Sequence, residues 1–123
     1  MLKYIKYDPD SGSVEAALRQ SIEFTTSLPF DVFFTYIDGD KAIDQAYVFA
    51  PKEPVSGGYQ PEVGCMVQMR LIANGNAAHA PDFSAFKTMT GSQGWVNDNG
   101  TINLVLMYYD STDYSVGITQ LEE

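Results

Sequence analysis

The sequence predicts an α+β fold: a mostly antiparallel sheet of about six to seven strands with one N-terminal helix, in the order β-α-β-β-β-(short helix)-β-β-β. Apolar residues near the N-terminus recur at helical spacing, whereas those from Phe30 onward alternate with a period of two. The chain has 123 residues, which is the usual length of one domain. We therefore expect a single globular domain over residues 1–123.

The first two elements are expected to be a strand and a helix. Residues 2–7, LKYIKY, form a short candidate strand. The segment from Ser13 to about Ser27 predicts a helix, because four apolar residues fall on one face at i, i+3, i+4 and i+8. These residues are Val14, Ala17, Leu18 and Ile22. Ser13 can cap this helix, and Pro29 ends it.

The next two strands are expected at residues 30–37 and 42–49, on either side of Asp38-Gly39. This dipeptide suits a type I′ turn, since glycine accepts the positive φ angle that such a turn requires. A two-residue hairpin places Phe34 opposite Ile43 and separates a core face from a half-polar face. The core face consists of Phe30, Val32, Phe34, Tyr36, Ile43, Tyr47 and Phe49, and the half-polar face exposes the apolar residues Phe33, Ile37 and Val48.

The rest of the chain predicts four more strands and one short helix. Residues 63–73 alternate, with Val63, Cys65, Val67, Met69 and Leu71 on one face. The preceding residues, 50–62, contain three prolines and two glycines and predict a long loop. A short helix is expected from residue 82 to about residue 88, followed by a meander of strands at 92–96, 101–109 and 114–121 with a turn at 110–113.

The charge of the chain argues against nucleic acid and membranes as direct partners. Sixteen acidic residues against seven basic ones give a formal net charge of −9, which repels phosphate backbones and anionic lipid surfaces. No apolar run approaches the roughly 20 residues of a membrane-spanning helix, and no apolar signal segment follows the first lysines. We therefore expect a cytoplasmic protein, with a virion component as an open alternative.

No metal ion or cofactor is expected from the residues that usually bind one. Cys65 and His79 are the single cysteine and histidine of the sequence, so thiolate clusters and multi-histidine sites are excluded. In the expected hairpin, Asp40 and Asp44 lie roughly 13 Å apart along one strand, too far to share an ion. Asp31 and Asp44 would form a diagonal pair about 7–8 Å apart, which leaves either an acid–base pair or a solvated polar face.

Aromatic residues supply the candidate ligand site. They make up 13% of the chain, a content that favours interfaces and ligand pockets. Tyr59 lies in the proline-rich loop, His79 in an irregular segment and Trp95 among glycines. In an acidic protein, Tyr59, His79 and Trp95 could bind a cationic or aromatic small molecule through cation–π contacts and stacking, although filling of the core is the alternative role for the aromatic rings.

The function predicted from these observations is a non-enzymatic acidic protein-interaction module that self-associates. Its interface would consist of Phe33, Ile37 and Val48, assisted by a free edge at the last strand of the meander. One alternative is a small-molecule-binding domain for a cationic or aromatic ligand. A second alternative is an acidic decoy of nucleic acid. An enzyme is disfavoured, because it would have to act through carboxylates, tyrosines or His79 alone.

Overall fold

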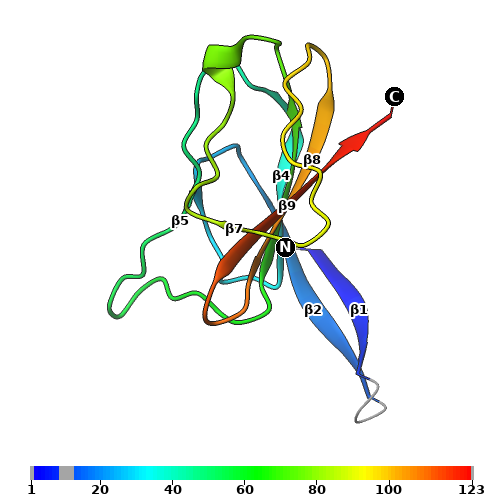
Figure 1. Ribbon diagram of the computed structural model, residues 1–123. Helices are drawn as coiled ribbons and strands as arrows, with labels where there is room; N and C mark the ends of the chain where they lie inside the picture. The colour runs from blue at the N-terminus through cyan, green and yellow to red at the C-terminus, as the bar shows by residue number, and fades with distance from the viewer. Residues whose placement is uncertain (1, 9–12, 123) are drawn as a thin grey trace.

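The computed structural model describes residues 2–8 and 13–122, and this part of the chain is built almost entirely of strands (Figure 1). Seven of the strands form one sheet in the order β1-β2-β4-β6-β8-β9-β7, and β3 pairs with β5 in a small parallel ribbon. The strands are β1 (Leu2–Asp8), β2 (Ser13–Ile22), β3 (Ser27–Leu28), β4 (Phe34–Ala42), β5 (Ala50–Pro51), β6 (Met66–Ile72), β7 (Lys87–Thr88), β8 (Ile102–Tyr109) and β9 (Tyr114–Leu121), with the 3-10 helix η1 (Ala77–His79) after β6. The predicted α+β class is wrong, since no α-helix occurs in the described residues.

The segment predicted as the N-terminal helix forms strand β2. It pairs antiparallel with β1 from Leu2↔Arg19 to Asp8↔Ser13, and residues 19–22 also pair parallel with β4. The sequence SVEAALRQSI fits a strand as well as a helix, because Val14, Ala16, Leu18 and Ile22 also fall at even spacing. Helix propensity is a weak preference that strand pairing on two sides outweighs here.

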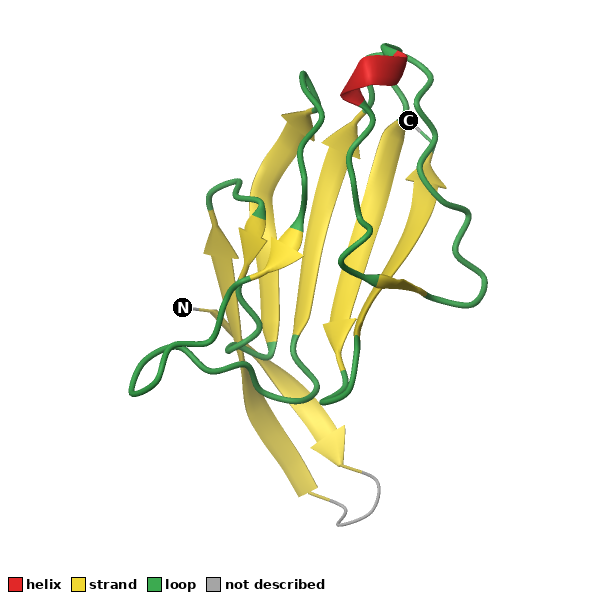
Figure 2. Ribbon diagram, turned by 60° about the vertical axis from the view of Figure 1, so that its left-hand side comes forward, coloured by secondary structure: helices red, strands yellow, loops and turns green. Residues whose placement is uncertain are grey.

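The sheet is mixed, which corrects the prediction of a mostly antiparallel one. The pairs β2·β4, β4·β6 and β7·β9 are parallel, whereas β1·β2, β6·β8 and β8·β9 are antiparallel. Parallel neighbours cannot be joined by a tight turn, so the chain must return along the sheet between them. Residues 23–33 and 43–65 make these two returns, and both run over the same face of the sheet (Figure 2).

The predicted hairpin at Asp38-Gly39 does not form. β4 continues through both residues and pairs with β6 on either side of them, so Phe34 lies beside Met66 and not opposite Ile43. The pairing jumps from Tyr36↔Gln68 to Asp40↔Arg70, so that four steps along β4 match two along β6. Gly39 has φ +73° within this bulge, and glycine adopts that angle without strain. The dipeptide therefore supplies the expected backbone angle to a bulge within one strand.

Three other predicted elements also differ from the structure. The strand predicted at 42–49 is absent: Ala42 ends β4, residues 43–49 form only a single bridge between Val48 and Asp82, and residues 92–96 form no strand. The helix expected from Asp82 is absent: after one turn, in which Phe86 N–H donates to Phe83 O (2.9 Å), residues 87–88 pair with β9 as strand β7. The last strand, β9, is not the sheet edge, since β7 pairs with it and β1 is the outer strand on the other side.

The core lies between one face of the sheet and the layer of long loops. Backbone hydrogen bonds tie the loops together: Phe49 N–H donates to Asp82 O (3.0 Å), and Lys52 N–H donates to Leu28 O (2.8 Å). The segments outside the main sheet contribute the buried residues Leu28, Phe30, Ile43, Phe49, Cys65 and Phe86, and the sheet contributes Ile37, Val67, Met69, Leu71, Val105, Met107, Val116 and Ile118. We call this side of the sheet the covered face.

Candidate functional site

The structure does not bring the three predicted ligand residues into one pocket. The hydroxyl of Tyr59 accepts the Phe30 N–H (2.8 Å), which places it beside the segment that precedes β4. His79 lies in η1, after the opposite end of the parallel strands. Trp95 donates from Nε1 to Asn97 Oδ1 (2.9 Å), and its ring lies 6.5 Å from that of Phe83. Tyr59 is therefore separate from the other two.

His79 and Trp95 are linked by a chain of amide side chains. Asn97 Nδ2 donates to the Asn76 carbonyl (2.9 Å), and the Asn76 side chain lies 3.5 Å from His79 Nε2. On the other side of the ring, Asn74 Nδ2 lies 2.6 Å from His79 Nδ1. Both ring nitrogens of His79 thus have amide neighbours, and this arrangement orders the loops at this end of the sheet.

Cations of the protein itself lie over aromatic rings that could have received a cationic ligand. Arg19 Cζ lies 4.8 Å from the centre of the Tyr36 ring, and Lys52 Nζ lies 4.7 Å from that of Tyr59. Lys41 Nζ lies 4.9 Å from the Phe24 ring and 5.7 Å from the Tyr47 ring. A cationic ligand would have to displace one of these side chains, which weakens its cation–π gain.

The predicted interface residues do not share a surface. Val48 is 61% exposed, as expected, and Phe33 is half-buried. Ile37 is only 5% exposed and belongs to the core, so the expectation that it is exposed is wrong. The hairpin register places Ile37 on the exposed side, whereas the parallel pairing of β4 with β2 and β6 turns Thr35 and Ile37 into the covered face and Phe34 and Tyr36 away from it.

The two carboxylates considered as an acid–base pair are also separated. Asp31 precedes the start of β4 and Asp44 follows its end, and nine residues of strand span roughly 30 Å. The Tyr47 hydroxyl donates to Asp44 Oδ1 (2.8 Å), and this bond lowers the pKa of the Asp44 carboxyl. Asp44 is thus an exposed carboxylate with a tyrosine partner, away from Asp31.

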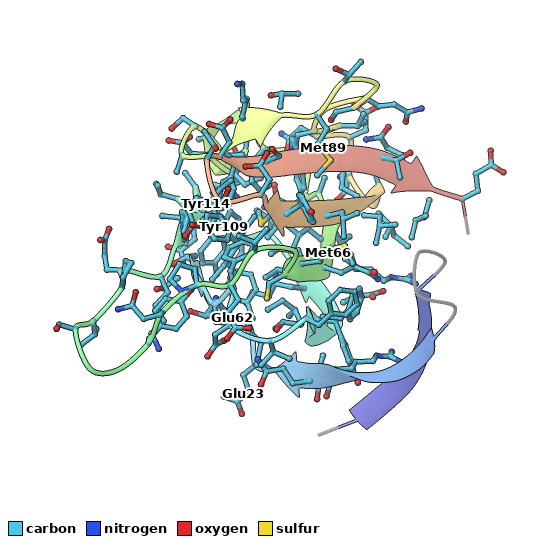
Figure 3. The ribbon with its side chains drawn as sticks, turned by 90° about the horizontal axis from the view of Figure 1, so that it is seen from below. Glu23, Glu62, Met66, Met89, Tyr109 and Tyr114 are labelled. Carbon is cyan, nitrogen blue, oxygen red and sulfur yellow. The ribbon has the colours of Figure 1, made fainter. Side chains whose placement is uncertain are left out.

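The sheet face opposite the loops carries several half-buried apolar side chains. The pairing registers place alternate residues of β2, β4, β6, β8 and β9 on it, and most of them are half-buried or exposed, although Ile102 at the start of β8 is 7% exposed. No described strand or helix forms a second layer over this face. Figure 3 shows Met66 on this side and Tyr109 and Tyr114 on the other. We call it the open face: Arg19, Phe34, Tyr36, Asp40, Met66, Gln68, Arg70, Leu104, Leu106, Tyr108, Gly117 and Thr119.

A hollow of about 270 Å³ lies on the open face where β8 and β9 meet the segment after β7. Leu104 and Leu106 form its floor, and residues 89–92 form one wall. A Cβ atom on Gly117 would lie 2.9 Å from the Met89 sulfur, so the missing side chain lets Met89 lie over β9. The lining is mostly apolar and can hold one aromatic or aliphatic group.

Charged side chains are few on the open face and are engaged with neighbours. Arg70 Nε lies 2.8 Å from Asp40 Oδ1, an ion pair that joins β4 to β6. The guanidinium of Arg19 lies over the Tyr36 ring, and its buried Nε has no hydrogen-bond partner among the described side chains. Both arrangements leave planar guanidinium groups on the open face.

Sequence reasoning missed the open face, although β8 carries a signal for it. The run INLVLMYY is apolar at almost every position, so both faces of this strand are apolar. Continuous apolar runs are typical of strands covered on both sides. The loops cover Val105 and Met107 completely, but Leu104 and Leu106 keep solvent contact.

Searches for metal and membrane features give no site in the described part of the chain. Among these residues no three histidine, cysteine or acidic side chains lie close enough to hold a metal ion. The same residues include no helix of the length and apolarity needed to cross a membrane. Comparison of the chain with protein-family models, with curated proteins and with solved structures yields no match.

Proposed function

We propose that this protein is a non-enzymatic acidic interaction module that self-associates through the open face of its sheet. The observation that carries the proposal is the apolar open face, which no second layer of the described chain covers. When a partner covers the exposed side of a strand that is apolar on both faces, the free energy falls by roughly 25 cal/mol per Å² of apolar surface that is buried. The half-buried Leu104 and Leu106 side chains lie at the centre of the surface that such a partner would cover.

The exposed area of the chain supports a protein-sized partner. The chain exposes 7177 Å², whereas a compact monomer of 13.6 kDa exposes about 6,600 Å². The excess of about 600 Å² approaches the roughly 800 Å² that each partner buries in a standard interface. An open sheet face and a β1–β2 hairpin that extends past the sheet both contribute to this excess (Figure 1).

The distribution of charge favours a second copy of the chain at this face. Among the open-face residues named above, Arg19 and Arg70 against Asp40 sum to +1, whereas the whole chain carries a formal charge of −9. Two copies repel each other through their other surfaces, and the open face is where they can meet with the least repulsion. The predicted place of action remains the cytosol, with the virion as the open alternative.

The hollow supports binding of a small aromatic molecule as a second candidate function. Its volume of about 270 Å³ lies just below the usual range of ligand pockets, about 300–1,000 Å³, and its lining is apolar. A cationic ligand has less support, because Arg19, Lys41 and Lys52 lie over the candidate rings. The decoy of nucleic acid gains no specific support, since carboxylates such as Asp82 and Asp110 accept backbone N–H groups in turns.

Light scattering on two matched variants tests self-association. Leu106→Glu places a charge at the centre of the open face, and Val48→Glu makes the same change at a position 61% exposed on the loop layer. We expect wild type and Val48→Glu to be oligomeric at micromolar concentration and Leu106→Glu to be monomeric with an unchanged circular dichroism spectrum. Loss of the oligomer in Val48→Glu alone, or a wild type that is monomeric throughout, would contradict the proposal.

A further inference from the structure

We propose that two copies pack open face against open face around a two-fold axis that runs along β6, so that Tyr36 of each copy enters the hollow of the other. This arrangement rests on the self-association proposed above and specifies its geometry. It makes an intermolecular sandwich of two sheets about 10 Å apart, the spacing at which facing sheets pack.

The order of the strands selects β6 as the axis. β6 is the fourth of the seven strands in the sheet, so three strands lie on each side of it. A half-turn about β6 places β4 of one copy over β8 of the other, β2 over β9 and β1 over β7. Every strand of one sheet then faces a strand of the other, and no apolar part of the open face is left beyond the edge of the contact.

The pairing register brings Tyr36 to the hollow without any shift along the strands. Tyr36 pairs with Gln68, Gln68 with Leu106 and Leu106 with Gly117, so these four residues form one row across the sheet. Rotation about β6 preserves the row and places Tyr36 of one copy over Leu106 of the other. Leu106 and Gly117 both line the hollow, so the tyrosine ring meets the place where a side chain is missing.

The other face-to-face arrangement leaves space unfilled. A two-fold axis perpendicular to the strands would place β8 over β8 and β9 over β9, so the two hollows of about 270 Å³ would face each other. Groups that line an unfilled void lose their dispersion contacts, and protein interiors avoid such voids. Rotation about β6 instead fills each hollow with a ring from the other copy.

The Tyr36 ring is already held in place before it meets a partner. The guanidinium of Arg19 lies 4.8 Å from its ring centre, and the Phe34 ring lies 6.2 Å away. A side chain that is ordered in the free protein loses less conformational entropy on binding. Tyr36 thus has the properties of an anchor residue, since it is aromatic and pre-ordered and faces a pocket.

Distances between spin labels on the two copies test the axis. In a Cys65→Ala background, one label is placed on Gln68→Cys, on the axis, and another on Ser21→Cys of β2, two strands away. We expect backbone separations of about 10 Å at position 68 and about 22 Å at position 21, from strand and sheet spacings. Equal short distances at both positions in a dimer would overturn this arrangement but leave self-association intact. A chain that stays monomeric overturns both.

A pair of substitutions tests the same contact without labels. Tyr36→Ala should weaken the dimer at least about tenfold, as expected for truncation of an aromatic anchor. Adding Leu106→Trp should restore most of that affinity, since residues 36 and 106 meet only between copies and are two strands apart within one copy. Phe34→Ala with Leu106→Trp is the control, because residue 34 lies in a different row, and we expect no restoration there. Equal restoration in both double variants, or in neither, would overturn the proposed contact.

Discussion

Met69 and Met66 belong to the same strand, β6, but lie on opposite faces of the sheet. Met69 is 1% exposed among core residues, whereas Met66 on the open face keeps solvent contact. The loops supply Phe30, Phe49 and Phe86 to the covered face, and no comparable layer of the described chain lies on the other. The comparison teaches that one face supplies the folding free energy, which leaves the other available for a partner.

The largest difference between the faces should appear when each methionine is truncated. Met69→Ala leaves a cavity in the core, and buried Met→Ala changes reduce the free energy of unfolding by about 2–5 kcal/mol. Met66→Ala removes a half-buried side chain, so in the monomer its effect should be below about 1 kcal/mol. Urea unfolding at a concentration where the protein is monomeric measures both. Equal losses would show that the open face also holds the fold together.

A smaller effect is expected from the buried amide that ties the loops to the covered side. Asn103 is fully buried, and its Oδ1 accepts from Val96 N–H (3.1 Å) and from Gln120 Nε2 (2.9 Å). Its Nδ2 donates to the Val96 carbonyl (3.0 Å). Asn103→Ala leaves these groups unpaired, which should reduce the free energy of unfolding by about 1–3 kcal/mol.

The control for Asn103→Ala is Gln68→Ala, a polar residue on the open face with the same kind of side chain. We expect this change to alter the free energy of unfolding of the monomer by no more than about 0.5 kcal/mol. A larger loss for Gln68→Ala than for Asn103→Ala, measured by urea unfolding, would reverse the roles assigned to the two faces.

The smallest effect should appear only at alkaline pH, through the thiol of Cys65. Burial on the covered face raises the pKa of this thiol to about 11. Because the folded state holds the proton more tightly than the unfolded one, its contribution to stability is complete below the unfolded pKa of about 8.5 and is lost as the pH rises toward 11. Wild type should therefore lose more stability than Cys65→Ala between pH 8 and 10 by about 1–2 kcal/mol. If the free energies of unfolding of wild type and Cys65→Ala instead change equally between pH 8 and 10, the Cys65 thiol is accessible to water in the folded protein.

The C-terminal part of the fold could be predicted from sequence because its partners are neighbours in the chain. Residues 101–109 and 114–121 form β8 and β9, the turn at 110–113 joins them, and Val116 and Ile118 face the core as predicted. The alternation over residues 63–73 also marked the correct buried face of β6, apart from Val63, which is 63% exposed. Antiparallel neighbours leave a local pattern that single-sequence reasoning can detect.

The N-terminal half could not be predicted because its partners are distant in the chain. Nothing local indicates that residues 19–22 pair parallel with 34–37, or that 34–42 pair with 66–72. The glycine at 39 indicated a positive φ angle, but a turn and a bulge use the same angle. The prediction of a hairpin turn at residue 39 assigned the wrong face of β4 to the core. Ile37, a core residue, was therefore predicted to be part of an exposed interface.

The molecular mass of the wild-type chain in solution tests the central claim most directly. Sedimentation equilibrium over nanomolar to high micromolar concentration should show a transition from 13.6 kDa to about 27 kDa, twice the mass of one chain. High salt should not dissociate the dimer, because its contacts are mainly apolar and because salt screens the electrostatic repulsion between two acidic copies. A mass that stays at 13.6 kDa at every concentration and salt would contradict the claim that the open face joins two copies.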